Sequence, residues 1–325
     1  MLAARAIATD PDRPLSGLRL EDAPEPQPPD GWEVVEVRAA ALNHHDLWSL
    51  RGVGIRPEHL PVILGTDAAG VAADGREVVV HAVLSDPADG GGDETLSPDL
   101  HLLSERGIDG TLAERVAVPS RNLLDKPGSL SFAEAACLPT AYLTAYRMLF
   151  SRGGLRPGGR VLVQGAGGGV GTAAIILASA AGCVAYATSR TEEKRDRAEA
   201  LGAVALEPGD RLPERVDLVV ETVGRATWEH SLRSLRPGGT IVVSGATSGD
   251  PGAGLARLFW RGLTVAGSTM GTRTEFQELC RLVERAGLRP AIDSTWPLDG
   301  AAEAMARLEG GEVFGKVVVT AGEGS

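Results

Sequence analysis

The chain has 325 residues, 43% of them hydrophobic and 23% charged, which is enough for two globular domains. Its formal net charge of −11 argues against nucleic acids and anionic membranes as partners. Three widely spaced cysteines indicate neither a metal site nor a disulfide framework, so a cytoplasmic location is expected. The first residues lack the apolar core of a signal peptide, and the most apolar stretch, 173–181, is too short to span a membrane.

The first 125 residues contain short runs rich in β-branched and apolar residues, separated by turns rich in proline and glycine. This pattern predicts a small, mostly antiparallel β domain. The expected strands are 3–8, 33–41, 68–73, 77–83 and 111–118.

A helix is expected over 130–150, beginning with Ser131 and Glu134 as a capping box. From Arg160 onward, strands alternate with helices, which predicts a parallel sheet with helical crossovers. The expected strands are 160–164, 183–188, 217–221, 240–243 and 263–267. The last 55 residues add helices at 275–286 and 300–308, an extended run at 290–295 and a strand at 316–320.

Five glycines within seven positions, 165–171, follow the expected strand at 160–164 and precede an Ala-rich helix. A strand, a glycine-rich turn and a helix present backbone N–H groups and a helix N-terminus to a pyrophosphate. The spacing departs from G-x-G-x-x-G at its first position, where Ala166 stands. Gly168 still lets a phosphate approach the backbone, and Gly171 still lets the helix pack against its strand.

The end of the second strand indicates which dinucleotide binds. NAD-binding domains usually carry an acidic residue there, whereas this chain has Ser189 followed by Arg190, with Lys194 one helical turn on. A guanidinium and an ammonium attract a 2′-phosphate that a carboxylate would repel, so NADPH is expected over NADH. The alternative is that 192–195 form an ordinary solvated helix face with i,i+3 ion pairs.

This order of elements and motifs resembles the medium-chain dehydrogenase/reductase superfamily over the whole chain, and within it the zinc-free quinone oxidoreductase (zeta-crystallin-like) branch. The matching segments are Ala-Ala-Ala-Leu-Asn-His-His-Asp at 39–46, Gly-Thr-Asp-Ala-Ala-Gly at 65–70, Leu-Pro-Thr-Ala-Tyr-Leu-Thr-Ala-Tyr at 138–146, Gly-Gly-Val-Gly at 168–171, Arg-Pro-Gly-Gly at 236–239 and Phe-Gly-Lys at 314–316. The resemblance implies an α/β fold with a chaperonin-10-like (GroES-like) β catalytic domain at 1–125 and 270–325. It also implies a Rossmann domain with a doubly wound parallel sheet at 126–269, a nicotinamide cleft between the domains, and a homodimer.

The zinc-dependent relatives hold their catalytic metal on a Cys, a His and a third Cys or Asp. In this chain Asn43, Thr66 and Thr140 align with those positions, and none is a good zinc ligand. The stretch 84–105, where relatives bind a structural zinc, contains no cysteine. A rearranged site would use His44, His45, Asp46 and Thr66, but adjacent histidines on an extended strand point to opposite faces. No metal is therefore expected.

Without zinc, another group must polarise the substrate carbonyl. By resemblance, the amide of Asn43 is the first candidate donor, and His45 or His44 could supply a proton near neutral pH. Trp48 stands where many relatives carry a tyrosine; its indole N–H can donate a hydrogen bond but cannot serve as a proton source. Asp46 is expected to anchor the loop. The alternative for both histidines is a structural, hydrogen-bonded role.

The resemblance also implies a set of cofactor-binding residues from several strand ends. Thr144 would lie near the nicotinamide, with ordinary core packing as its alternative. The full set is Thr144; Gly168, Gly169 and Val170; Ser189, Arg190 and Lys194; Ser244, Gly245 and Ala246; Ser268, Thr269 and Met270; and Phe314 and Lys316.

The leading hypothesis is therefore an NADPH-dependent, zinc-independent oxidoreductase that reduces a quinone, an enone or enal, or a ketone. Two alternatives stay open: a zinc-type alcohol dehydrogenase, and a non-catalytic NADPH-binding protein that acts as a redox sensor or structural protein. The expected partners are a small-molecule carbonyl or quinone and a second copy of the chain, paired through the strand at 263–267.

Overall fold

The computed structural model describes residues 1–322, which divide into two units. Unit 1 comprises Met1–Thr140 and the segment from Thr272 onward, and unit 2 comprises Ala141–Gly271. The boundaries expected from the sequence lie at 125/126 and 269/270, and residues 323–325 of the expected first domain lie outside the described residues. The first boundary differs because the helix α2 (Phe132–Ala136) packs on β3, β5 and β16 of unit 1.

Unit 1 is built on a seven-stranded sheet with the order β15-β16-β3-β5-β6-β8, in which β7 also pairs with β3. A second sheet has the order β2-β1-β4. All the pairs are antiparallel except β15 with β16, which confirms the mostly antiparallel β domain. The strands are β1 (Leu2–Ala6), β2 (Leu18–Asp22), β3 (Trp32–Ala41), β4 (Val62–Ile63), β5 (Asp67–Ala72), β6 (Glu77–Val80), β7 (Arg115–Pro119), β8 (Leu123–Asp125), β15 (Ile292–Pro297) and β16 (Lys316–Thr320).

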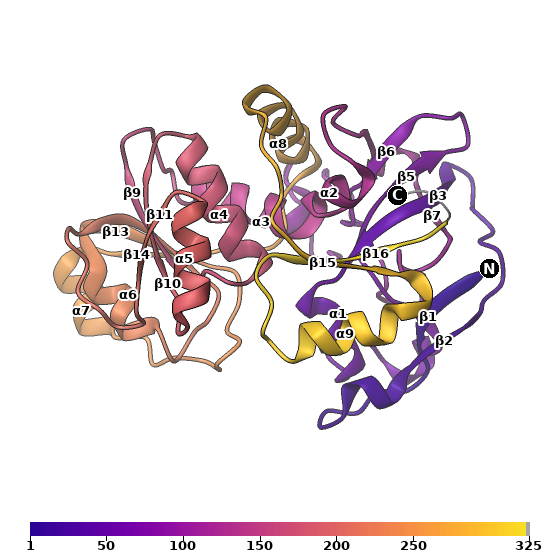
Figure 1. Cartoon of the computed structure of the whole chain (residues 1–325), viewed down its shortest axis with the longest axis horizontal. Helices are drawn as coiled ribbons and strands as arrows, with labels where there is room; N and C mark the ends of the chain where they lie inside the picture. The colour runs from indigo at the N-terminus through magenta and orange to yellow at the C-terminus, as the bar shows by residue number, and fades with distance from the viewer. Residues whose placement is uncertain (323–325) are drawn as a thin grey trace. The chain divides into compact units, whose positions relative to one another are not determined.

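The return of the C-terminal strand β16 to the first sheet positions the later site. β16 lies between β15 and β3 (Figure 1), and Val318 pairs with Ala41 in antiparallel register. The N–H of Leu42 then donates to the carbonyl of Val317 at 2.9 Å. Lys316 is therefore brought beside the residues that follow β3, although they lie at the other end of the sequence.

The α-helices of unit 1, among the described residues, are α1 (His44–Leu50), α2, α8 (Arg273–Ala286) and α9 (Ala301–Glu309). The capping box at the start of α2 is confirmed, because Ser131 and Glu134 bond to each other's backbone N–H groups. The helix expected over 130–150 continues to Arg152, but wider π-helical turns at Leu138–Tyr142 and Arg147–Arg152 interrupt its α-helical segments.

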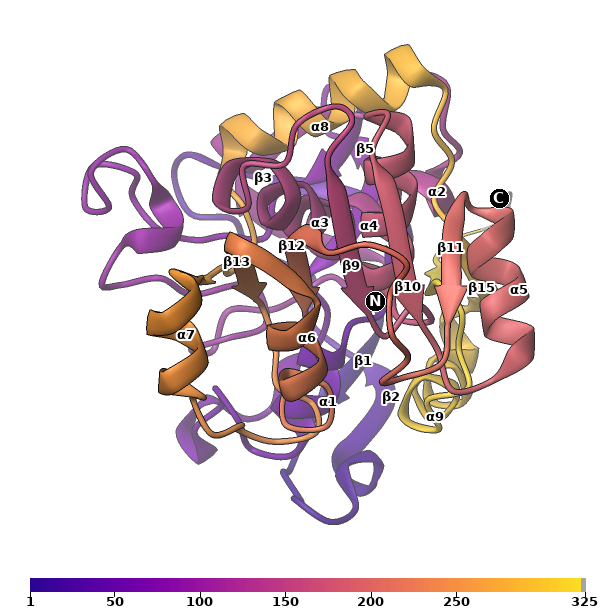
Figure 2. The same ribbon diagram turned by 90° about the vertical axis from the view of Figure 1, so that its left-hand side faces the viewer.

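Unit 2 is a six-stranded, fully parallel sheet with the order β11-β10-β9-β12-β13-β14. Figure 2 faces this sheet, and β13, β12, β9, β10 and β11 follow one another across it. The elements are α3 (Leu143–Tyr146), β9 (Arg160–Gln164), α4 (Gly169–Ala180), β10 (Val184–Thr188), α5 (Glu192–Ala200), β11 (Ala203–Leu206), β12 (Val216–Glu221), α6 (Trp228–Ser234), β13 (Leu235–Val243), α7 (Leu255–Arg261) and β14 (Thr264–Gly267).

The apolar core of unit 2 is consistent with a parallel sheet that is covered by helices. β9, β12 and β13 contribute buried branched residues such as Leu162, Val219 and Ile241, which pack with Trp228 and Leu232 of α6. Strands covered by helices are apolar on both faces, as is typical of a parallel sheet. The strand order reverses between β9 and β12, and open α/β sheets bind ligands outside the carboxyl ends of the strands at such a point. The doubly wound fold is confirmed.

Among the residues that the structure describes, none of the helices combines the length and the apolarity needed to cross a bilayer.

Candidate functional site

In unit 2 the glycine-rich turn connects β9 to α4. Gly165 has φ +79°, in the left-handed region that favours glycine. A Cβ atom on Gly171 would lie 2.3 Å from the carbonyl oxygen of Gly165, so only glycine lets the helix approach the turn this closely. A Cβ on Gly168 would meet nothing within 4 Å, which leaves open space beside that backbone. The turn is tight where the helix packs and open where a phosphate would approach.

The N-terminus of α4 has the properties of an anion site. The helix is 12 residues long, begins at Gly169 after the N-cap Gly168, and no side chain caps it. The N–H groups of a first helical turn lack intrahelical partners and carry partial positive charge. The structure therefore places Gly168, Gly169 and Val170 together at a helix start that can receive a pyrophosphate.

The end of β10 carries the residues expected to select the cofactor. Ser189 is buried, and its N–H donates to the carbonyl of Leu206 at 3.1 Å. Arg190 is exposed, and its guanidinium makes no ion pair or hydrogen bond within the described residues. Arg195 is held in place, because it donates to the carbonyl of Ser189 at 3.0 Å and pairs with Glu207 at 3.2 Å. Arg190 therefore keeps its donors available at this strand end, and Lys194 lies on the first turn of α5.

A buried carboxylate that the sequence analysis missed organises the neighbouring turn. Glu221, the last residue of β12, is fully buried and accepts bonds from the N–H groups of Val223 and Gly224 at 2.9 and 3.0 Å. It also accepts from the hydroxyls of Thr227 and Ser231 at 2.9 and 2.6 Å. The sequence signal that could have found it is an acidic residue that follows the apolar run Leu218–Val220 and directly precedes a turn. Glu221 fixes the turn at the strand end where ligands of such sheets bind.

The turns after β13 and β14 also meet at this edge of the sheet. The N–H of Ser244 donates to the carbonyl of Glu221 at 3.0 Å, and that of Ser268 donates to the carbonyl of Val243 at 2.9 Å. The hydroxyl of Ser268 is buried and has no hydrogen-bond partner among the described residues. Met270 has φ +50°, which is unusual for a residue with a side chain. An unpaired buried hydroxyl and a strained residue are typical of a ligand-binding turn.

Unit 1 carries a closed ring of five polar side chains, which we call the polar ring: Asn43, Thr66, Asp67, Thr140 and Lys316. The amide Nδ2 of Asn43 donates to Thr66 Oγ1 at 3.1 Å, and the hydroxyls of Thr66 and Thr140 lie 3.2 Å apart. Thr140 donates to Asp67 Oδ1 at 2.5 Å. The ammonium of Lys316 closes the ring, with Asp67 Oδ2 at 3.1 Å and Asn43 Oδ1 at 2.6 Å.

The hydrogens of the polar ring can be assigned from these contacts. Thr140 gives its hydrogen to the carboxylate of Asp67, so the hydroxyl of Thr66 must donate to Thr140. The second amide hydrogen of Asn43 goes to the carbonyl of Ala41 at 3.2 Å. Lys316 uses its third hydrogen on the carbonyl of Leu42 at 2.8 Å. Every hydrogen of the amide and of the ammonium therefore has an acceptor.

Lys316 and Phe314 were expected from the sequence to bind the cofactor. In the structure the ammonium of Lys316 forms hydrogen bonds within the polar ring, and its side chain is 3% exposed. Phe314 is buried, and its N–H donates to Asp293 Oδ1 at 2.9 Å. Thr144, on α3 of unit 2, is also buried. None of these three side chains presents the free polar surface of Arg190.

The histidines do not lie on an extended strand, so that expectation was wrong: His44 and His45 are the first two residues of α1. Asp46 anchors this helix start, as expected, by accepting from the N–H groups of Asn43 at 2.8 Å and Gly65 at 3.1 Å. Because Asp46 caps the backbone at Asn43, a helix begins at this point. The imidazoles of His44 and His45 therefore point in different directions and have different surroundings.

His45 Nε2 lies 2.9 Å from Glu105 Oε1. Desolvation alone would lower the pKa of His45, but the hydrogen bond to Glu105 and the nearby carboxylates raise it. His44 is exposed, and desolvation followed by the charges of Lys316 and Arg51 lowers its pKa. Trp48, 37% exposed, lies under the guanidinium of Arg51 at 5.4 Å from the ring centroid. His45 thus has a structural partner, whereas His44 and Trp48 face outward from α1.

The thiol of Cys137, which follows α2 in unit 1, is fully buried. Burial raises the pKa of Cys137 to about 12, so it stays protonated at neutral pH.

Comparisons with known proteins match both parts of the chain. The family model described as "Alcohol dehydrogenase GroES-like domain" matches residues 29–128, and "Zinc-binding dehydrogenase" matches residues 184–319. A crotonyl-CoA reductase of Streptomyces avermitilis is 29% identical, covering 97% of this chain and 84% of its own.

Two solved structures share the whole fold. An NAD-dependent alcohol dehydrogenase has a TM-score of 0.90 and 36% identity, covering 99% of this chain and 100% of that chain. A 2-octenoyl-CoA carboxylase reductase, solved in complex with NADP and 2-octenoyl-CoA, has a TM-score of 0.91 and 26% identity, covering 99% of this chain and 88% of that chain.

Proposed function

The chain belongs to the medium-chain dehydrogenase/reductase superfamily, in its zeta-crystallin-like branch, and from this premise we propose that it is an NADPH-dependent, zinc-independent reductase of conjugated carbonyl compounds. The proposed substrates are quinones and α,β-unsaturated carbonyls. The latter include enoyl thioesters, the class that appears in the names of two relatives of this chain. The observation that carries the proposal is the polar ring of unit 1, which offers an amide donor in place of a metal.

The residues at the aligned ligand positions do not fit zinc. Asn43, Thr66 and Thr140 provide a neutral amide and two hydroxyls, whereas zinc sites use thiolate, imidazole and carboxylate ligands. The ammonium of Lys316 belongs to the same ring and already bonds to Asn43 and Asp67, so a metal cation placed there would be repelled. Within residues 1–322, no three His, Cys, Asp or Glu side chains are grouped as a metal site would require. The proposed reaction therefore has no step through zinc.

The residues of unit 2 do fit a nicotinamide dinucleotide. The uncapped start of α4, with Gly168, Gly169 and Val170, would hold the pyrophosphate. Ser189, Arg190 and Lys194 would hold the 2′-phosphate of NADPH, with Arg190 as the free guanidinium. The turns after β13 and β14, at 244–246 and 268–270, would complete the site. The bound cofactor would supply the hydride, and all other roles fall to the side chains of the chain.

At the substrate, Asn43 would act as the hydrogen-bond donor. Its amide hydrogen now directed at the carbonyl of Ala41 would turn to the substrate oxygen as negative charge develops there. Lys316 acts as a positioning residue: its ammonium, 2.6 Å from Asn43 Oδ1, fixes which end of the amide faces outward and polarises the N–H bonds. The product of quinone reduction can take its proton from water, so neither His44 nor His45 is required for that substrate.

A substrate panel tests the proposal directly. NADPH oxidation, followed at the nicotinamide absorbance, should be stimulated by quinones, enones or enoyl thioesters. On the best substrate found, Asn43→Ala should lower kcat by roughly one to three orders of magnitude with little change in NADPH affinity, because the donor matters most where charge develops. Asn43→Asp, which keeps the shape but removes the N–H donor, should lose a similar factor.

Thr140→Val is the matched control. It breaks two contacts of the polar ring but leaves the amide of Asn43 in place, so it should lower kcat by less than about threefold, well short of the loss expected for Asn43→Ala. Wild-type turnover by Asn43→Asp would contradict the donor role. NADPH binding without turnover across the whole panel would instead support a non-catalytic sensor.

We also propose a homodimer through β14. This strand lies at the edge of the sheet in unit 2, and Val265 on it is 44% exposed. The preceding helix α7 exposes Leu255, Phe259 and Trp260. An unpaired apolar edge is a liability that edge-to-edge pairing across a two-fold axis removes.

A further inference from the structure

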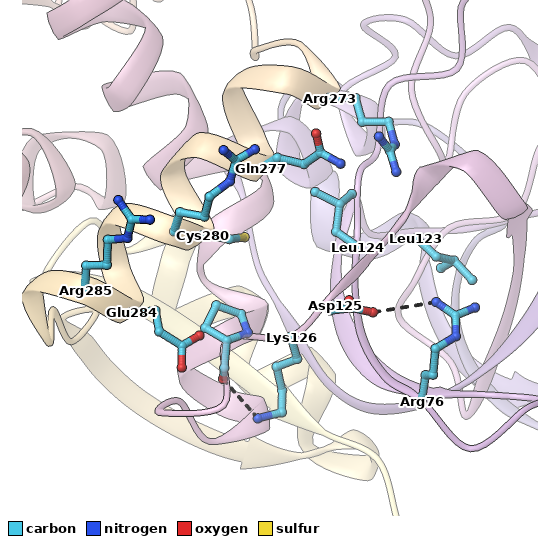
Figure 3. A pocket seen from close by; sticks show the side chains of 12 residues that line it. Arg76, Leu123, Leu124, Asp125, Lys126, Arg273, Gln277, Cys280, Glu284 and Arg285 are labelled. Carbon is cyan, nitrogen blue, oxygen red and sulfur yellow. Dashed lines mark hydrogen bonds and ion pairs between the residues drawn. The ribbon is translucent and has the colours of Figure 1, made fainter.

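Unit 1 contains a hollow of about 480 Å³ whose lining shares no residue with the polar ring or the glycine-rich turn. The end of β8 and the residues after it, 123–127, form one wall, together with Arg76. One face of α8 forms the other wall (Figure 3). A hollow of this volume is in the range that holds a small ligand.

The polar face of α8 lines the hollow. Arg273, Gln277 and Arg281 follow at intervals of four residues, and Arg285 continues the series, so all four lie on one side of the helix. The opposite side, with Phe276, Leu279 and Val283, is buried. An ordinary amphipathic helix would turn such a polar face to bulk water. Here this face also borders the second wall of the hollow, with Arg273 and Gln277 half-buried and Arg281 and Arg285 exposed.

The charge of the hollow is opposite to that of the protein. Its lining contains five cations, which are Arg76, Lys126, Arg273, Arg281 and Arg285, and two carboxylates, which are Asp125 and Glu284. The whole chain carries a formal net charge of −11. A concave surface of one sign concentrates field lines and attracts ions of the other sign.

The cations differ in how far they are already neutralised. Arg76 pairs with Asp74 at 2.6 Å, and Lys126 pairs with Glu77 at 3.1 Å and also donates to two backbone carbonyls. The side chains of Arg281 and Arg285, by contrast, form no ion pair or hydrogen bond with any described residue. Their donors are free for a ligand.

We propose that this hollow binds a small molecule that carries two or more phosphate groups. Guanidinium groups match phosphate oxygens with paired hydrogen bonds, and the free arginines are separated by one helical turn. The volume and the acidity of the rest of the chain exclude a nucleic acid polymer as the occupant. The proposal is independent of the reductase activity, because none of these residues belongs to the proposed cofactor or substrate sites.

Titration calorimetry with inorganic pyrophosphate and adenosine 3′,5′-bisphosphate tests the site on the full chain. The wild type should bind one of them at low salt, and binding should weaken as salt is added. The double variant Arg281→Gln/Arg285→Gln should bind about ten- to a hundredfold more weakly, since two charge-assisted contacts are lost. Its affinity for NADPH should stay unchanged. The single variant Arg285→Glu gives the same test if the double variant folds poorly.

The control is Arg13→Gln/Arg56→Gln, which removes the same charge from two exposed arginines elsewhere in unit 1 and should change affinity by less than about twofold. Equal binding by the wild type and the Arg281/Arg285 variant would overturn the proposal. So would the absence of binding at millimolar concentration, or equally tight binding of citrate, which would show attraction of any anion. A parallel titration of Arg190→Ala should leave the bisphosphate affinity intact and so separate this site from the cofactor site.

Discussion

Replacing Lys316 by methionine should destabilise unit 1 by about 3–5 kcal/mol, the usual cost of breaking a buried ion pair from one side. Methionine fills a similar volume but supplies none of the three hydrogen bonds to Leu42, Asn43 and Asp67. The carboxylate of Asp67, which has no exposed surface, then loses its countercharge. The loss is a large fraction of the roughly 5–15 kcal/mol that stabilises an ordinary domain.

The double-mutant cycle Lys316→Met with Asp67→Asn gives the interaction energy itself. Urea denaturation followed by circular dichroism should show that the double variant loses at least about 1 kcal/mol less than the sum of the single variants, because a neutral amide is cheaper to bury than an unpaired carboxylate. Lys126 is a second buried lysine in unit 1, and its partner Glu77 is 56% exposed. The cycle Lys126→Met with Glu77→Gln should therefore show weak coupling, below about 1 kcal/mol. Equal coupling energies in the two cycles would refute the reasoning.

Arg190→Ala should weaken NADPH binding by about 1.5–3 kcal/mol and leave NADH nearly unaffected, measured by fluorescence titration; equal losses would remove the 2′-phosphate assignment. Activity should survive a chelator, and elemental analysis should find less than one zinc per chain, whereas a tightly bound zinc lost together with activity would count against the metal-free mechanism. Val265→Pro should weaken the dimer in sedimentation. The N–H of Ser268 donates to β13, and alternate residues of a strand point their N–H groups to opposite sides, so the N–H of Val265 lies on the open edge and proline would remove it. A monomeric wild type at micromolar concentration would contradict the proposed dimer. Glu105→Gln should cost about 1 kcal/mol at pH 6 and less at pH 9 in denaturant titrations. The fold raises the pKa of His45, so the stability that protonated His45 contributes is complete below the ordinary histidine pKa of 6.5 and is lost as the pH rises through the pKa of His45 in the folded protein. If the stability difference between the wild type and Glu105→Gln is the same at pH 6 and pH 9, the pair does not titrate as inferred.

Local patterns were sufficient to predict most of the fold. The strands of unit 2 are short, apolar and bounded by glycine-rich turns, so periodicity alone located β9, β10, β12 and β14 to within about two residues. Weak elements were missed: β2 and β11 are short and partly exposed, and α1 has only seven residues. For α1 the deciding interaction is the bond from Asn43 N–H to Asp46, a local cap that competes with the extended state.

The sequence suggested Asn43 as a candidate donor but did not predict the network around it. The polar ring joins residues 23, 74 and 249 positions apart, and such contacts depend on the register of β16 against β3. Glu221 was missed for a similar reason, because its partners become visible only when the turn folds back over the end of β12. Strand periodicity contains no information about either arrangement.

The hydrogens of the polar ring have a further consequence for selectivity. The amide of Asn43 is already bonded to the carbonyl of Ala41, so an incoming oxygen must compete with a peptide oxygen for that hydrogen. A neutral ketone or quinone oxygen is no better an acceptor than a peptide carbonyl and gains almost nothing from the exchange. An oxygen that is acquiring negative charge is a much stronger acceptor and wins the hydrogen. The hydrogen bond from Asn43 to Ala41 thus prevents tight binding of the unreacted substrate oxygen, so that the amide stabilises the transition state selectively.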